Sequence, residues 1–195
     1  MSQEKELSKE FFLQDTVTAA RDLLGCLLIH KSSEGLLGGY IVETEAYLGH
    51  KDLACHSYRG RTKRNEVMFL GAGLVYVYII YGLYYCLNFT SASEDNPEAV
   101  LIRALEPVSG IEIMQKNRNK TKPKELCSGP GKLAQALGVD MELNGTAIGD
   151  KITVYERGTN ELNNNITATT RIGISQAADL PLRFYIKGNP FISKK

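Results

Sequence analysis

The sequence predicts a single α+β domain: a curved, mainly antiparallel β-sheet with peripheral helices and a protruding tyrosine-rich β-hairpin. One observation is that residues 67–93 contain no charged side chain, while residues 74–89 hold five of the ten tyrosines. Another is that strand-like segments follow one another without a regular βαβ alternation, which favours an antiparallel sheet. Finally, 195 residues, 43% of them hydrophobic, are enough for one core, and no Pro/Ser-rich linker or repeat divides them.

The tyrosine-rich segment gives the clearest structural signal in the chain. It is long enough for a membrane helix, but β-branched and aromatic residues around the interior Gly82 favour two strands joined by a turn. The turn would expose Tyr81 and Leu83, where a soluble hairpin normally places Asn, Asp or Gly. An aromatic tip of this kind is typical of a wedge that enters the DNA minor groove and separates stacked bases.

The remaining elements follow from caps, glycines and alternating apolar residues. A helix over 18–24 is expected to stop at Gly25, Ser109 is expected to cap a second helix, and a third helix over 131–137 is expected to end at Gly138. Further strands are expected at 26–30, 39–45, 99–105, 151–156, 171–175 and 183–187.

Domain organisation and cellular location follow from the chain ends and the cysteines. Residues 1–195 are expected to form one domain, with roughly the first ten as a flexible polar tail that does not resemble a signal peptide. Cysteines 26, 55, 86 and 127 lack a C-x-x-C pair, so we expect reduced, buried thiols in an intracellular protein. A zinc site at Cys55 and His56 has no supporting ligand spacing, and we expect no metal. The expected compartment is the cytoplasm or nucleoid in bacteria and the nucleus in eukaryotes.

Charge is unevenly distributed along the chain. The formal net charge of +1 does not indicate a nucleic-acid-binding protein, because such domains usually carry a clear basic excess. Two basic runs nevertheless flank the hairpin. The first contains Arg59, Arg61, Lys63 and Arg64, and the second contains Lys116, Arg118, Lys120, Lys122 and Lys124. Either run could bind phosphates, and the alternative is that both are solvated loops.

Several catalytic motifs are absent. The segment 128–132 is similar to a phosphate-binding loop, but Leu126 stands where the motif requires glycine and Leu133 where it requires Ser or Thr. The sequence contains neither the G-x-S-x-G motif of serine hydrolases nor the paired H-x-E and P-C-x-x-C motifs of zinc deaminases.

Two carboxylates near the end of the 39–45 strand are better candidates for chemistry. Glu43 and Glu45 would lie on one face of the strand, with Cα atoms about 6 to 7 Å apart. Arg103 interrupts an otherwise apolar strand, and a buried guanidinium requires a carboxylate or carbonyl partner. One ionised carboxylate could activate water in such a site. A purely structural ion pair is the alternative for Glu43.

At this level of detail the chain resembles a known family, the alkyladenine (3-methyladenine) DNA glycosylases. The resemblance spans nearly the whole chain. It rests on motifs that agree in their order and in their residues: VETEAYLG at 42–49, ACHS at 54–57, YVYIIYG at 76–82, Asn88, LEP at 105–107, CSGP at 127–130 and RFY at 183–185. It implies a single α+β domain that excises damaged purines from DNA.

The resemblance also implies roles for two charged residues. Glu45 would be the general base that deprotonates the water attacking the sugar carbon. Arg103 would help to position that water, while Glu43 receives no role. No lysine is placed near Glu45, so the expected enzyme is a monofunctional glycosylase that leaves an abasic site.

The same resemblance implies how the damaged base is held. Tyr47, His56 and Tyr78 would enclose the flipped base, with stacking worth roughly 1 to 3 kcal/mol. Tyr81 would intercalate into the vacated stack, and Asn88 would crowd the exocyclic amine of guanine. Without the resemblance, His56 would be assigned as a structural histidine. Tyrosines 76, 84 and 85 are expected in the sheet or core.

These assignments imply no cofactor and name double-stranded DNA containing damaged purines as the partner of a monomer that does not bind membranes. 3-Methyladenine, 7-methylguanine, hypoxanthine and ethenoadenine all stay open as substrates. Two other function classes are compatible with the sequence. A non-catalytic damaged-DNA-binding module could use the same wedge, and a membrane-surface protein could use the tyrosines as an interfacial belt.

Overall fold

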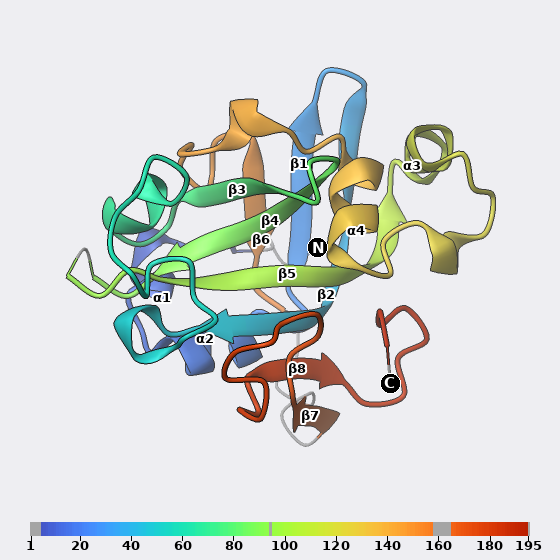
Figure 1. Ribbon diagram of the computed structural model, residues 1–195. Coiled ribbons are helices and arrows are strands. Elements are labelled where there is room, and N and C mark those ends of the chain that lie inside the picture. Colours follow the sequence, from blue (N-terminus) through green and yellow to red (C-terminus); the bar gives the residue numbers. More distant parts are fainter. Residues whose placement is uncertain (1–4, 94, 158–164, 195) are drawn as a thin grey trace.

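The computed structural model describes residues 5–93, 95–157 and 165–194 (Figure 1). Its α-helices are α1 (Lys9–Phe12), α2 (Thr16–Asp22), α3 (Ile111–Arg118) and α4 (Pro130–Leu137). Its 3₁₀ helices are η1 (Gly49–Lys51), η2 (Glu66–Phe69), η3 (Pro123–Glu125) and η4 (Met141–Leu143). Its strands are β1 (Leu27–Ser32), β2 (Gly35–Tyr47), β3 (Val75–Ile80), β4 (Tyr84–Ser91), β5 (Glu98–Ser109), β6 (Ile152–Tyr155), β7 (Ile166–Thr169) and β8 (Arg183–Ile186). Within these residues, no helix has the length and apolar character needed to cross a membrane.

The named strands form one curled sheet in the order β3-β4-β5-β2-β1-β6, with β8 pairing to β2 and β7 to β8. All of these strand pairs are antiparallel, which confirms the predicted fold class. Strand β2 changes its neighbour on one side, because it pairs with β1 as far as Tyr40 and with β8 from Glu43. Its ladder with β5 also shifts register around Glu43. This exchange of neighbours accompanies the curl of the sheet in Figure 1.

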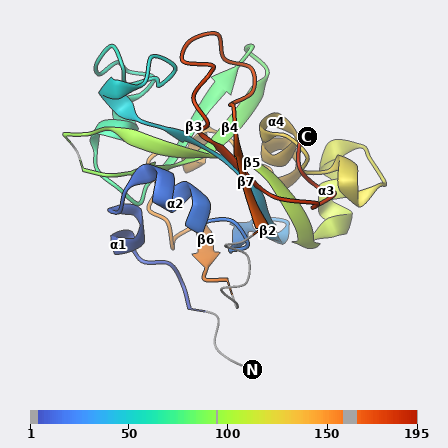
Figure 2. The same ribbon diagram turned by 90° about the horizontal axis from the view of Figure 1, so that it is seen from below.

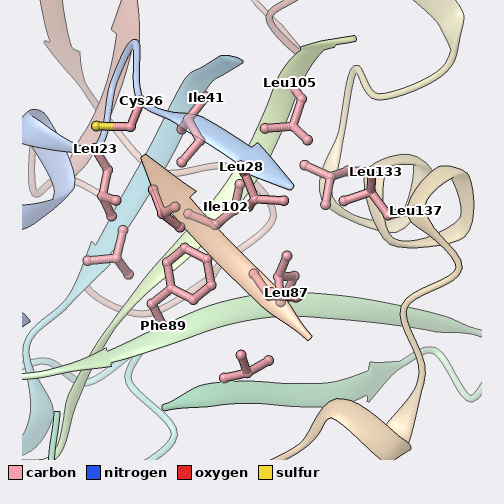
Figure 3. Close-up of a cluster of buried hydrophobic side chains, with 14 of the residues drawn as sticks. Leu23, Cys26, Leu28, Ile41, Leu87, Phe89, Ile102, Leu105, Leu133 and Leu137 are labelled. Carbon is pink, nitrogen blue, oxygen red and sulfur yellow. The ribbon is translucent and has the colours of Figure 1, made fainter. Parts of the chain in front are cut away.

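Most of the core lies on one face of this sheet. Because side chains alternate along a strand, Val75, Leu87, Phe89, Val100 and Ile102 point away from the face that carries Glu45. In the close-up of Figure 3, strand residues meet Leu23 at the end of α2 on one side and Leu133 and Leu137 of α4 on the other. Figure 2 brings α1 and α2 to the near side of the sheet, with α3 and α4 together at one end.

Strands β3 and β4 form the hairpin that the sequence predicts. Their ladder ends at the pair Ile80–Tyr84, and the backbone N–H of Leu83 donates to the carbonyl of Ile80 across the turn at 3.2 Å. Tyr81 and Gly82 both have positive φ, 55° and 67°. Gly82 adopts this conformation without strain, whereas Tyr81 does not, because the side chain of an L-residue crowds the backbone there. Tyr81 is 84% exposed.

Two local predictions were wrong. Ser109 does not cap α3: it ends β5, its hydroxyl donates to the carbonyl of Leu36, and Gly110 with φ 69° occupies the N-cap position. Residues 171–175 are not a strand either, because the strand at this edge is β7, which ends before them. Arg171 instead turns its side chain into the protein and forms a buried ion pair with Asp52.

The other helices and strands lie where they were predicted, with ends shifted by a few residues. Helix α4 has the expected left-handed C-cap at Gly138 (φ 67°). Helix α2 ends earlier than expected, at Asp22, with Leu23 as a right-handed C-cap, and Gly25 (φ 83°) follows two residues later. Of the tail expected over the first ten residues, 1–4 lie outside the described residues. Leu7 is buried, and its backbone N–H donates to the carbonyl of Val154 at the edge of the sheet.

Candidate active site

A row of side chains crosses five strands on the sheet face opposite the main core. Cross-strand pairing connects Arg183 to Glu45, Glu45 to Leu101, Leu101 to Asn88, and Asn88 to Tyr76. Directly paired residues in an antiparallel sheet project from the same face. Strand pairing therefore brings together residues that are up to 138 positions apart in the chain, from Glu45 to Arg183.

This face opens into a cavity of about 390 Å³. Strands β2 to β5 supply its floor, the loop before β3 supplies one wall, and the loop after β7 and the start of α4 supply others. The residues that line it include Tyr47, His56, Arg64, Tyr76, Tyr78, Tyr81, Tyr84, Asn88, Arg103, Gly131 and Ile172. Cys55 and Cys86 also line the cavity, and all four cysteines are buried free thiols.

The Glu45 carboxylate is fully buried beside the cavity. Its Oε1 accepts a hydrogen bond from the Ile172 N–H at 2.8 Å and contacts Arg103 Nη1 at 3.2 Å. Its Oε2 accepts from the Tyr47 hydroxyl at 2.9 Å. Burial raises the pKa of Glu45 above its usual value and outweighs the opposing effects of Arg103, Ile172 and Tyr47. Tyr47, Arg103 and Ile172 all line the cavity, whereas Glu45 does not. Glu45 therefore lies directly behind the residues that form the cavity wall and is hydrogen-bonded to them.

Glu43 lies on the same face but has a different environment. Its carboxylate contacts Arg103 Nε at 3.1 Å and Arg183 Nη1 at 2.9 Å, and it accepts hydrogen bonds from the backbone N–H and hydroxyl of Ser193 at 2.6 and 2.8 Å. These four bonds occupy both oxygens of a carboxylate that does not line the cavity. The contacts describe a structural cluster that holds Arg103 between the two glutamates.

Aromatic rings form one wall of the cavity. His56 Nδ1 is 2.8 Å from the Tyr76 hydroxyl, and the His56 and Tyr78 rings meet edge to face with centroids 4.5 Å apart. Burial, with a smaller effect of the nearby Arg64 charge, lowers the pKa of His56 to about 4. His56 is therefore neutral near pH 7. Tyr76 combines two roles, because it is buried in a small hydrophobic cluster and also lines the cavity.

Tyr47 forms another wall of the cavity. Its ring packs against a buried ion pair between Arg171 and Asp52, which was not predicted from the sequence. The Arg171 guanidinium lies over its ring, 4.6 Å from the centroid, and forms two hydrogen bonds with Asp52, both side chains being fully buried. Arg171 also donates to the carbonyl of Ala46, and the next residue, Ile172, donates its N–H to Glu45. No local pattern marks this pair, because its members are 119 positions apart.

Asn88 presents a defined edge to the cavity. Its amide nitrogen donates to the backbone carbonyls of Tyr76 at 3.0 Å and Cys86 at 3.4 Å. Since both partners are acceptors, the other amide atom must be the oxygen. That oxygen has no protein partner among the described residues and is not among their buried unsatisfied atoms, so it faces the cavity.

The hairpin tip stands at the cavity mouth. Tyr81 and Tyr84 both line the cavity, and Tyr84 is 44% exposed even though it lies in the sheet. Gly131 at the start of α4 packs against it: a Cβ atom added at this glycine would come within 3.1 Å of Tyr84 Cβ. Figure 1 shows α4 beside this end of the hairpin.

The candidate phosphate-binding residues fall into two groups. Arg59, Arg61 and Lys63 are exposed in the loop after His56, whereas Arg64, also exposed, lines the cavity and lies over the Tyr78 ring. In the second basic run, Lys116 pairs with Glu34, and Arg118 donates to the carbonyl of Leu126. Lys120, Lys122 and Lys124 are exposed. Across the described residues, no three His, Cys, Asp or Glu side chains lie close enough together to hold a metal ion.

The chemistry available at this site follows from its parts. The cavity has aromatic walls, which suit a flat ring system, and most of its exposed lining is apolar. Among the described residues, Glu45 Oε2 accepts a hydrogen bond only from the Tyr47 hydroxyl, so it can accept another, such as one from a water molecule. A buried ionised carboxylate beside such a cavity can accept a proton from water.

Comparison with known proteins gives a consistent result. A family model described as methylpurine-DNA glycosylase matches residues 10–190. A protein of Methanoculleus marisnigri is 54% identical over 192 residues, covering 97% of this chain and 99% of the relative. Relatives from Francisella tularensis (54% identical, covering 92% of this chain and 94% of the relative) and Carboxydothermus hydrogenoformans (49%, covering 97% and 99%) are similarly close. All three carry the name "Putative 3-methyladenine DNA glycosylase".

Proposed function

Because the chain belongs to the methylpurine-DNA glycosylase family, we propose that it is a monofunctional glycosylase that removes damaged purines from double-stranded DNA. The observation that carries this proposal is the buried Glu45 carboxylate, one hydrogen bond behind a cavity with aromatic walls. The names of the relatives support a substrate class that includes 3-methyladenine. In the part of the chain that the structure describes, no lysine lines the cavity, which agrees with hydrolysis in preference to Schiff-base chemistry.

The proposed reaction uses water and two side chains. Glu45 takes a proton from the water, the water oxygen bonds to C1′ of the sugar, and the C1′–N bond breaks with its electron pair moving to the base. Arg103 holds Glu45 in place, and its positive charge favours the ionised form of the carboxylate. Tyr47, His56 and Tyr78 hold the extrahelical base between aromatic surfaces. Glu45 then releases its proton to solvent, and a neutral purine, which departs as an anion, takes up a proton from solvent. The products are a free purine and an abasic site.

The direct test is incubation of the protein with duplexes that each carry one lesion, followed by alkaline cleavage at abasic sites. We expect cleavage with at least one of 3-methyladenine, 7-methylguanine, hypoxanthine and ethenoadenine, and none with undamaged duplex. A non-catalytic damaged-DNA-binding module would bind the lesion duplexes and release no base. That outcome would contradict the proposal.

We expect replacement of Tyr81 by serine to impair base flipping while leaving folding nearly intact. The exposed ring makes no core contacts, so its loss opens no cavity and the thermal midpoint should hardly change. In DNA, the ring would fill the gap left by the extruded nucleotide, and the flipped state loses roughly a few kcal/mol without it. The measurements are thermal midpoint, single-turnover excision and the fluorescence of a flipped ethenoadenine.

Tyr81→Gly provides a matched control for this prediction. Glycine accepts the positive φ at this position without strain, so this variant should be at least as stable as the Tyr81→Ser protein and equally slow in excision. A large loss of thermal stability in both variants would show that Tyr81 is a folding residue. If both variants flip the damaged base as well as the wild type does, Tyr81 does not act as an intercalating wedge.

We expect Asn88→Ser to admit guanine-like bases. Serine is shorter than asparagine and withdraws the amide oxygen that faces the cavity, which removes the steric conflict proposed for an exocyclic 2-amino group. Removal of mismatched guanine should rise while hypoxanthine, which has no such group, is still removed. Unchanged guanine excision in a variant active on hypoxanthine would refute the steric explanation.

A further inference from the structure

Arg64 differs from every other charged group at the cavity. Of the described residues that line the cavity, only Arg64 and Arg103 carry a formal charge near pH 7, since burial keeps His56 neutral. Arg103 is compensated by contacts to Glu43 and Glu45. Arg64 forms no ion pair with a carboxylate of the described residues; it donates to the backbone carbonyl of Ile79 at 3.2 Å. The cavity wall therefore carries one uncompensated positive charge.

The position of this charge matters for a base held in the cavity. The guanidinium carbon of Arg64 lies 5.3 Å from the centroid of the Tyr78 ring, which is packed against His56. The negative face of an aromatic ring attracts one cation, and a second cation bound nearby is repelled by the first. The field of Arg64 also reaches the cavity interior, since it contributes to the lowered pKa of His56. A positively charged ligand is thus disfavoured beside Tyr78.

We propose that Arg64 is a specificity-determining residue that favours neutral damaged purines over cationic N-alkylated purines. This inference rests on the proposed glycosylase function and deepens it by sorting the substrates by charge. It also separates Arg64 from Arg59, Arg61 and Lys63, which are exposed in the same segment but do not line the cavity.

The movement of electrons as the C1′–N bond breaks also favours neutral over cationic purines. When the C1′–N bond of a neutral purine such as hypoxanthine breaks, the departing base gains the bonding pair and develops negative charge, which Arg64 stabilises. In a cationic purine such as 7-methylguanine, the same pair neutralises a positive charge already present. Arg64 then offers no stabilisation of the leaving group and opposes entry of the base into the cavity.

The test compares 7-methylguanine and hypoxanthine in duplexes that are otherwise identical. The quantity measured is the ratio of their second-order rate constants for single-turnover excision at subsaturating enzyme. Arg64→Gln removes the charge but keeps a donor for the Ile79 carbonyl, so the ratio of 7-methylguanine to hypoxanthine should rise about three- to tenfold. Arg64→Lys keeps the charge and should leave the ratio near the wild-type value.

Arg61→Gln is the matched control from the same exposed loop. It should weaken DNA binding equally for both duplexes and leave the ratio unchanged. If Arg64→Gln slows both lesions by one common factor, Arg64 is only a phosphate contact and the proposal is overturned. A fall in the ratio would overturn it as well. A wild-type protein that removes neither lesion would contradict the proposed glycosylase function itself, which is a distinguishable result.

Discussion

Replacing Glu45 by glutamine is expected to lower single-turnover excision of a neutral lesion by about 10³-fold. The amide preserves the size of the side chain and still accepts hydrogen bonds from Ile172 or Tyr47, but it cannot take a proton from water. Binding to a duplex that contains an abasic-site analogue should be retained, because this binding does not require residue 45 to accept a proton. The two measurements together separate lost chemistry from lost binding.

Glu43→Gln is the matched control, since Glu43 lies on the same strand face and also contacts Arg103. We expect a smaller loss of the chemical step in this variant, accompanied by a fall in stability as the cluster with Arg183 and Ser193 is weakened. Equal loss of excision in both variants would instead support a mechanism with two carboxylates. Near wild-type turnover in Glu45→Gln would exclude Glu45 as the base.

The pH profile offers a second measure of the same role. The general base must be ionised, so the wild-type rate should rise with pH through the pKa of Glu45, which burial places above its usual value of 4.5. Glu45→Gln should lack this rise while retaining its low residual rate. A variant that keeps the acidic limb would assign the titration to another group, such as His56, whose pKa is about 4.

Arg171→Leu is expected to cause the largest loss of stability, roughly 3 to 5 kcal/mol in the free energy of unfolding at neutral pH. The substitution leaves Asp52 ionised and buried without its bidentate partner, and it removes the bond to the Ala46 carbonyl. Arg171→Lys should also destabilise the protein, because an ammonium group cannot reproduce the two parallel bonds. Chemical denaturation monitored by circular dichroism provides the measurement.

The dependence of this effect on pH has a definite sign. Burial raises the pKa of Asp52, but the hydrogen bonds and charge of Arg171 lower it more, so the folded value lies below the ordinary 3.8. Asp52 therefore contributes stability above its unfolded pKa, and this contribution is lost as the pH falls through the folded pKa. The difference between wild type and Arg171→Leu should shrink in acid, where the variant can protonate Asp52.

Two further variants define what this result means. Lys5→Ala breaks the exposed ion pair with Glu156 and should change stability by less than about 1 kcal/mol. Adding Asp52→Asn to Arg171→Leu should recover part of the lost stability, because the unpaired buried charge is removed. A loss for Arg171→Leu no larger than that for Lys5→Ala would contradict the buried-pair interpretation.

Features that depend on short-range periodicity could be predicted from the order of the residues alone. Alternating β-branched and aromatic residues around Gly82 defined the hairpin and exposed Tyr81 at its tip, since a strand repeats every two residues and a turn needs a permissive backbone. The same period placed Glu43 and Glu45 on one face. Failures were also local: Ser109 is a good N-cap residue, but its hydroxyl bonds to Leu36 across the sheet.

The tertiary structure decided which of these residues share an environment. It surrounded Glu43 with Arg103, Arg183 and Ser193, and it left Glu45 beside the cavity, although both look equivalent in the strand pattern. It set Arg64 apart from the rest of its basic run by placing it over Tyr78. It also brought Arg171 to Asp52 across 119 positions. Periodicity fixes the direction of a side chain relative to its own strand, whereas burial, charge compensation and pKa depend on distant segments that only the folded chain brings together.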